Sequence, residues 1–160
     1  IKKLPAFVQA RKQNWQSIRT GLAGLETYFE FALPTHATGW SDGTFTWDHT
    51  GCRTDCSWFG FMILVRPDAP FTRTELARHL DEKRIGNRML FGGNLVRQPA
   101  FIELRKANPQ AFRTIGDLAG ADRLMNQAVF LGVYPGLSKA MLDFEIETIH
   151  RFVRQPTPAP

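Results

Sequence analysis

Two short, unbroken apolar runs mark where the interior of this chain can form: WFGFMILV at 58–65 and AVFLGVY at 128–134. An apolar run of this length fits a strand buried on both faces or a segment of a buried helix. The first run has only eight residues between a cysteine-containing loop and Arg66-Pro67, and this shortness favours a strand. The chain is therefore predicted to build a small sheet around these two segments.

Helical patterns surround the two predicted strands. Thr72 and Glu75 have the spacing of a capping box, and Phe71 and Leu76 that of a hydrophobic staple. Gly86 is expected to end this helix in the left-handed conformation. Two further helices are predicted over 4–25 and 138–153 from apolar residues at helical spacing. These residues are Leu4, Phe7, Val8, Trp15, Ile18, Leu22 and Leu25 in the first helix, and Leu142, Ile146, Ile149 and Val153 in the last.

The remaining segments are predicted to be less regular. Residues 34–56 are rich in turn-forming residues and indicate an extended loop. A short strand is expected over 87–91, followed by a long loop over 92–121. Asp122 is expected to cap a brief helix that ends at Gln127, and Ser138 to cap the last helix. The predicted fold class is α+β, with a small, mainly antiparallel sheet covered by helices and preceded by a long helix.

Composition sets limits on function without choosing one. A chain of 160 residues makes one domain of ordinary size, and its net charge of +5 favours anionic partners such as nucleotides, phosphosugars or nucleic acid. The sequence contains no run of about 18 apolar residues, so it does not predict a membrane-spanning helix. The chain begins without methionine in a helical pattern, so it is expected to be a piece of a longer protein. Residues 156–160 are expected to form a flexible tail.

Cysteine and histidine give no complete metal site in the sequence. Cys52 and Cys56 lie in GCRTDC, and they fit a pair of free thiols or a local disulfide. His49 and Asp48 would be needed as further ligands if this loop held a metal. Of the four histidines, His36 and His49 lie in the turn-rich segment, while His79 and His150 are expected to be solvated or packed on helices.

The segment GNRMLFGGNLVRQP at 86–99 carries the strongest binding signal. Its glycines leave backbone N–H groups accessible, and Arg88, Asn94 and Arg97 add two guanidinium groups and an amide. Such groups suit phosphate and sugar hydroxyls. Loop arginines that are simply solvated would give the same pattern.

Three strings resemble a known family: SWFGFMILV, PFTRTELARHLDEKRIGNRMLFGGNLVRQPAF and GDLAGADRLMNQAVFLGVYPGLSKAML. They resemble the C-terminal part of the CDP-6-deoxyhexulose 3-dehydrases, a branch of the DegT-type family of vitamin-B6-dependent sugar aminotransferases and dehydratases. The resemblance covers about 1–153. It implies an aspartate-aminotransferase-like fold with a connecting helix over 1–27, a small C-terminal domain over 28–155, and a large cofactor domain upstream.

The resemblance also implies the chemistry of the whole enzyme. Its substrate would be a CDP-linked 4-keto-6-deoxyhexose, which loses its C3 hydroxyl in the biosynthesis of lipopolysaccharide dideoxysugars. Pyridoxamine or pyridoxal phosphate and a 2Fe–2S cluster would serve the reaction, with electrons from a flavin- and iron–sulfur-containing reductase. The enzyme would be a cytoplasmic homodimer. The catalytic histidine and the cluster cysteines are expected upstream, so this segment alone should hold no catalytic residue, metal or cofactor and be inactive.

Five residues of this chain match family positions near the site. Phe59 matches an aromatic residue close to the cofactor and Trp58 is its neighbour, although both also fit core aromatics at the start of a strand. Arg88, Asn94 and Arg97 are expected to face the nucleotide sugar, with Arg97 as the first candidate for the diphosphate. The segment 41–56 is longer than the family's usual approach to SWFGF.

Two other functions fit parts of the sequence. A nucleotide-sugar aminotransferase would keep the family and differ in having lysine upstream, but the NLVRQP string is typical of the 3-dehydrases. A stand-alone nucleic-acid-binding α+β module would use the positive charge, and WFGFMILV is similar to an RNA-binding strand signature. That run lacks the leading basic residue and is apolar throughout, which argues against the module.

Overall fold

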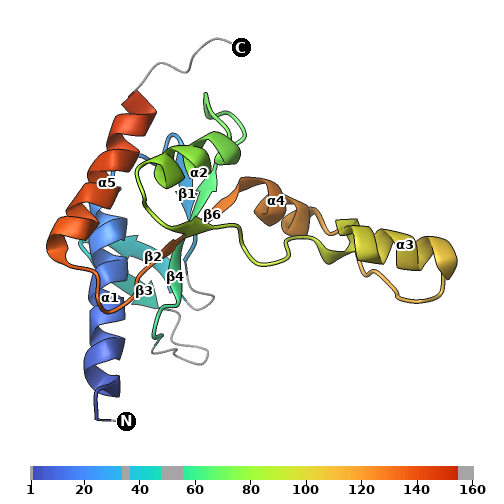
Figure 1. Cartoon of the computed structure of the whole chain (residues 1–160). Helices are drawn as coiled ribbons and strands as arrows, with labels where there is room; N and C mark the ends of the chain where they lie inside the picture. Colours follow the sequence, from blue (N-terminus) through green and yellow to red (C-terminus); the bar gives the residue numbers. More distant parts are fainter. Residues whose placement is uncertain (1, 34–36, 48–55, 155–160) are drawn as a thin grey trace.

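A computed structural model describes residues 2–33, 37–47 and 56–154 (Figure 1). The elements are α1 (Leu4–Gly21), β1 (Phe29–Phe31), β2 (Ala37–Ser41), β3 (Thr44–Trp47), β4 (Gly60–Val65), α2 (Arg73–Glu82), β5 (Asn87–Arg88), η1 (Leu95–Arg97), α3 (Pro99–Ala107), α4 (Ala119–Gln127), β6 (Ala128–Gly132) and α5 (Lys139–Arg154). Within these described parts, no helix is long and apolar enough to cross a membrane.

A four-stranded sheet organises the chain, in the order β1-β4-β6-β5 with every pair antiparallel. The two apolar runs form its centre, where Ile63 of β4 pairs with Val129 of β6. This confirms the predicted strands and the predicted α+β class with a small antiparallel sheet.

One face of the sheet carries the core. Phe61 and Ile63 of β4 are at most 1% exposed, because α1, α2 and α5 cover this face (Figure 1). The helices α1 and α5 approach closely at Gly21, where a Cβ atom would collide with the Ile146 side chain. His150 of α5 also shares a hydrogen bond of 2.7 Å with the Gly21 carbonyl oxygen. Of the two roles expected for His150, solvated or packed, this contact places it in the packing between α5 and α1.

The first helix is shorter than predicted and is only half covered. It ends at Gly21 rather than near residue 25. Trp15 and Ile18 are buried, whereas Leu4 and Phe7 are 59% and 47% exposed. Figure 1 shows the first turns of α1 reaching past the sheet, so the apolar stripe continues beyond the surface that this chain covers.

The second helix begins as predicted and ends differently. The reciprocal bonds of the capping box are present between Thr72 and Glu75, with the Thr72 N–H donating to the Glu75 carboxylate at 2.6 Å. The left-handed residue at its end is Arg84, with φ of 60°, and not Gly86. Ile85 N–H then donates to the Leu80 carbonyl at 2.9 Å, as in a Schellman motif. The prediction for Gly86 was wrong because the hydrogen bonds of the Schellman motif place the left-handed residue at Arg84, two residues before Gly86.

Residues 34–56 were predicted to be an extended loop, but the described part forms the hairpin β2–β3. Asp42 and Gly43 turn the chain with φ of 49° and 75°. The hairpin packs on α1 through aromatic rings, with Trp40 and Phe45 at 5.3 and 5.1 Å from Trp15. The expectations for Asp48, His36, His49 and Cys52 concern positions outside the described residues.

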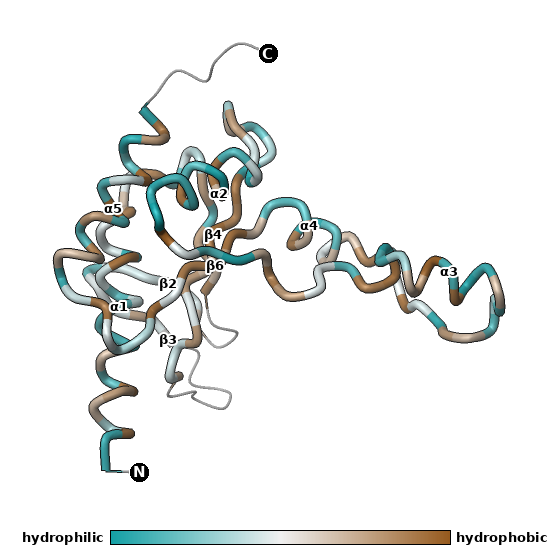
Figure 2. Tube along the Cα trace, in the orientation of Figure 1, coloured by the Kyte–Doolittle hydropathy of each residue, from teal (hydrophilic) through white to brown (hydrophobic). Residues whose placement is uncertain are grey.

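The predicted loop over 92–121 contains η1, α3 and the beginning of α4. Figures 1 and 2 show α3 extending away from the sheet, with hydrophobic positions along it. No residue of α3 is buried. Pro99 opens this helix and Arg105 and Lys106 occupy its last turn, which are ordinary helix signals. The predicted strand over 87–91 is only Asn87–Arg88.

Candidate functional site

The second face of the sheet exposes a group of phenylalanine rings. Phe59 precedes β4, Phe130 lies on β6, and Phe91 follows β5. The Phe59 ring lies 5.7 Å from Phe130 and 6.4 Å from Phe91, nearly parallel to both. Phe59 and Phe91 are 69% and 81% exposed. We call Phe59, Phe91 and Phe130 the aromatic face; such exposed apolar clusters typically mark binding surfaces.

Local backbone features place these rings. Gly60 has no side chain, and a Cβ atom there would collide with the Phe130 ring and the Leu131 carbonyl. Phe91 has φ of 46°, a left-handed conformation that is uncommon for a bulky residue and is found where function or packing holds it. The turn after β5 thus brings Phe91 to the two other rings.

Arg88 adds a positive charge beside the aromatic face. It is exposed on β5 and is the cross-strand partner of Phe130. Directly opposite residues on one face of an antiparallel pair lie close together. A guanidinium and flat apolar rings in one place can accept a diphosphate and a planar base or cofactor ring.

Trp58 lies elsewhere, although it is next to Phe59 in the sequence. Its ring stacks on Trp15 at 4.7 Å, and its carbonyl accepts a hydrogen bond of 2.9 Å from the Arg11 guanidinium. The structure therefore places Trp58 in the packing between α1 and the hairpin, and places Phe59 on the opposite, open face.

The GGNLVRQP loop is held against α4 by one carboxylate. Asp122 accepts a hydrogen bond of 2.8 Å from the Asn94 amide. It also forms a bidentate ion pair with the Arg97 guanidinium, in which one contact is 2.5 Å. Hydrogen bonds from Arg97 and then Asn94 lower the pKa of Asp122 to about 2. Asp122 was predicted to cap this helix, which is wrong: α4 begins at Ala119, and Asp122 lies inside it.

Glycines allow this loop to lie close to α4. Gly93 has φ of 60°, and a Cβ atom there would be 2.6 Å from the Met125 side chain. The Gln98 side chain closes the turn by donating to the Gly92 carbonyl at 2.7 Å. The loop is consequently a fixed turn, anchored by its polar side chains.

The hydrogen bonds to Asp122 leave the two predicted substrate-binding residues Asn94 and Arg97 differently accessible. Asn94 is 2% exposed, and its amide is committed to the loop. Arg97 pairs through one edge of its guanidinium, while its side chain remains 58% exposed. Arg88 lies opposite Phe130, whose ring lies 5.7 Å from Phe59. Sequence reasoning missed Phe130, which the pairing of β5 and β6 places there, and Phe91, which the turn after β5 places there. The only available signal was that each is an aromatic residue in or beside a predicted strand.

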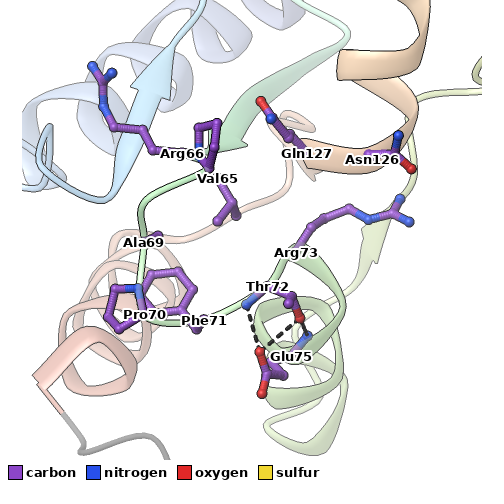
Figure 3. A pocket seen from close by; sticks show the side chains of 11 residues that line it. Val65, Arg66, Ala69, Pro70, Phe71, Thr72, Arg73, Glu75, Asn126 and Gln127 are labelled. Atoms are coloured by element: carbon purple, nitrogen blue, oxygen red, sulfur yellow. Dashed lines mark hydrogen bonds between the residues drawn. The ribbon is translucent and has the colours of Figure 1, made fainter.

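A hollow of about 440 Å³ lies between the end of β4 and the start of α2 (Figure 3). The Arg66 guanidinium donates hydrogen bonds to the backbone carbonyl oxygens of Glu26 and Phe29, at 2.6 and 3.3 Å. Glu75 already caps the N-terminus of α2. These polar groups hold the chain turn together, so the aromatic face remains the better candidate site. Among the described residues, no group of three or more His, Cys, Asp or Glu side chains could hold a metal ion.

Two known proteins are similar to nearly the whole of this chain. The chain is 38% identical to a dTDP-4-dehydro-2,6-dideoxy-D-glucose 3-dehydratase of Saccharopolyspora spinosa over 96% of its own length and 28% of that protein. It is 33% identical to the lipopolysaccharide biosynthesis protein RfbH of Salmonella typhimurium, over 95% of the chain and 30% of the relative. The chain thus spans less than a third of the length of these relatives.

The fold is also found in solved structures. An E. coli GDP-4-keto-6-deoxy-D-mannose-3-dehydratase with bound hydrated PLP matches 92% of this chain and 32% of its own, with a TM-score of 0.67 and 21% identity. The predicted aminotransferase-like fold is therefore confirmed. The model of the DegT/DnrJ/EryC1/StrS aminotransferase family matches residues 1–150. The chain belongs to the DegT/DnrJ/EryC1/StrS aminotransferase family.

Proposed function

We propose that this chain is the small C-terminal domain of a nucleotide-sugar 3-dehydratase dependent on pyridoxamine or pyridoxal phosphate. The proposed substrate is a CDP-linked 4-keto-6-deoxyhexose, which loses its C3 oxygen during the biosynthesis of lipopolysaccharide dideoxysugars. Support comes from two relatives, one named as a sugar 3-dehydratase and one as a lipopolysaccharide biosynthesis protein.

The observation that carries this proposal is the aromatic face with Arg88 at its edge. Phe59 and Phe91 expose flat apolar surface on the sheet face that α1, α2 and α5 leave uncovered. In the whole enzyme, this surface would close the nucleotide-sugar site from one side and exclude water from it. Arg88 would bind the diphosphate, and the outer edge of the Arg97 guanidinium would assist.

The aromatic face fits a supporting role toward the cofactor. It offers rings that can pack against a flat heterocycle, but none of its three residues is a lysine or histidine that could bond to the cofactor or move its proton. When bound, the cofactor supplies the electron sink for loss of the C3 hydroxyl. Phe59 would orient the reacting sugar and keep water out, with the proton-transferring residue in the large domain.

The other components of the reaction are assigned to the whole protein. We place the 2Fe–2S cluster, its cysteine ligands and the contact with a reductase in the large domain. The whole enzyme would act in the cytoplasm as a homodimer, and the isolated segment would be inactive. These assignments follow the family resemblance of the loop at 92–99.

The nucleotide base has a second candidate. The 38% identical relative is named for a dTDP sugar, so a dTDP-linked 4-keto sugar is the alternative substrate. A sugar aminotransferase is the second candidate reaction, favoured by the name of the family. Membership of this family over 150 residues argues against a stand-alone nucleic-acid-binding module.

The site is tested by variants in the whole protein that carries this domain. Arg88→Gln should raise KM for the CDP sugar roughly 10- to 100-fold, because a charge-assisted hydrogen bond contributes about 1.5–3 kcal/mol. Phe59→Ala should lower kcat as well, because water then enters the site. Arg78→Gln, the same change at an exposed arginine of α2, is the matched control. Equal KM values for the Arg88 and Arg78 variants would remove Arg88 from the site.

A further inference from the structure

A carboxyl group with no partner lies beside an apolar cavity on the opposite side of α5 from its exposed ion pairs. Glu145 is 6% exposed and makes no hydrogen bond or ion pair with any described residue. The cavity has a volume of about 360 Å³. Three segments line it: the turn after α2, the end of β6 with the turn that follows, and α5. Its lining includes Arg84, Tyr134, Met141, Phe144 and Glu145.

The opening of this cavity is apolar and accessible. Tyr134, Met141 and Phe144 are 60%, 57% and 53% exposed. An exposed apolar rim around a buried polar group is the usual construction of a small-molecule site, where walls supply contact area and a few polar groups fix orientation. Here Glu145 is the acidic group among the lining residues.

We propose that this cavity binds an alkyl- or arylammonium group, with the charge paired to Glu145 and the apolar body between Tyr134, Met141 and Phe144. Ionising a largely buried carboxyl group that has no partner is unfavourable, and a bound cation with N–H donors relieves this cost. The source of the ammonium is either a free small amine or the lysine side chain of a protein.

Other ligand classes fit the lining less well. A metal ion needs several oxygen, nitrogen or sulfur ligands, and this cavity provides one carboxylate. An anion would be repelled by Glu145, and a sugar would find apolar walls in place of hydroxyl partners. Arg84 also lines the cavity, but it is exposed, whereas Glu145 is buried and does not pair with it. The buried charge of the cavity is therefore the carboxylate, which is available to a ligand.

This inference does not depend on the proposed function. The cavity lies at α5, whereas the proposed nucleotide-sugar site lies at Phe59 and Arg88 on the other face of the sheet. Failure of one therefore leaves the other standing.

The test is a titration of the 160-residue chain with benzylamine at pH 8, followed by chemical shifts of residues around the cavity. We expect saturable binding with a Kd on the order of millimolar, the range for a fragment of this size. Glu145→Gln should weaken binding at least tenfold, while Glu147→Gln, an exposed position two residues along α5, should not change it. Equal binding by the Glu145→Gln variant, or no saturable binding, would overturn the proposal.

A second test compares two ligands on the unaltered chain, so no effect of a substitution on folding can influence the result. On the unaltered chain, benzylamine should bind at least tenfold more tightly than benzyl alcohol, which has the same ring and no charge. Equal affinities would refute the pairing with Glu145. Nα-acetyl-lysine methylamide distinguishes the sources: binding tighter than benzylamine indicates a protein lysine, and weaker binding a free amine.

Discussion

Glu145 is expected to make the stability of this chain fall as pH rises, and Glu145→Gln to remove that dependence. Burial raises the pKa of the Glu145 carboxyl from 4.5 to about 7. The folded chain therefore binds this proton more tightly than the unfolded chain does. Its contribution to stability is fully present below pH 4.5 and is lost as pH rises through about 7.

The magnitude follows from the two pKa values. A difference of about 2.5, at about 1.4 kcal/mol for each pKa unit, gives roughly 3 kcal/mol between pH 4.5 and pH 8. This is a large share of the stability of a domain of this size. The source is desolvation, because no opposite charge is paired with the carboxylate.

Urea unfolding at several pH values between 4.5 and 8 measures this effect. The free energy of unfolding of the unaltered chain should fall by roughly 3 kcal/mol more than that of the Glu145→Gln variant. Glu147→Gln is the matched control on the same helix, because its carboxylate is exposed and paired with Arg151 at 2.7 Å. Parallel pH profiles for the unaltered chain and the Glu145 variant would refute the reasoning.

Three further predictions concern the elements that hold the site. Asp122→Ala should speed amide hydrogen exchange over 92–98 without affecting α5. Acidification should have the same effect. Because the pKa of Asp122 is lowered from 3.8 to about 2, its contacts with Asn94 and Arg97 are lost as pH falls through that range. Unchanged exchange would show that the loop does not need this carboxylate. Arg84→Gly should stabilise the chain by about 1 kcal/mol in urea unfolding, because glycine tolerates positive φ; a loss of stability would contradict this. Thr72→Ala should cost about 1 kcal/mol by losing the helix cap, and no measurable loss would contradict the cap.

The centre of the fold could be predicted because its signals are local. Burial of both faces makes β4 and β6 apolar throughout, and the capping box at Thr72 needs only residues three apart. The hairpin β2–β3 was missed although Asp42-Gly43 is a favoured hairpin turn, because many other turn-forming residues surround it. The helix α3 was missed because its apolar residues are not covered by the rest of the chain.

The candidate site was only partly predictable for a different reason. Phe59 and Arg88 were identified from the resemblance, but their neighbours Phe91 and Phe130 depend on strand register and on a left-handed turn at Phe91. Likewise, the pairing of Arg97 and Asn94 with Asp122 joins residues 25 and 28 positions apart. A single sequence does not specify such pairs, which exist only after α4 has packed beside the loop.

The central claim is tested most directly by the product that the whole protein makes. The protein carrying this domain would be incubated with a CDP-linked 4-keto-6-deoxyglucose, pyridoxamine phosphate, a reductase and an electron donor for that reductase, with the dTDP sugar in parallel. We predict a product that has lost the C3 oxygen and keeps its C4 carbonyl, formed only when the cofactor is present. A 4-amino sugar that retains its C3 hydroxyl, formed with an amino acid as donor, would contradict the 3-dehydratase assignment.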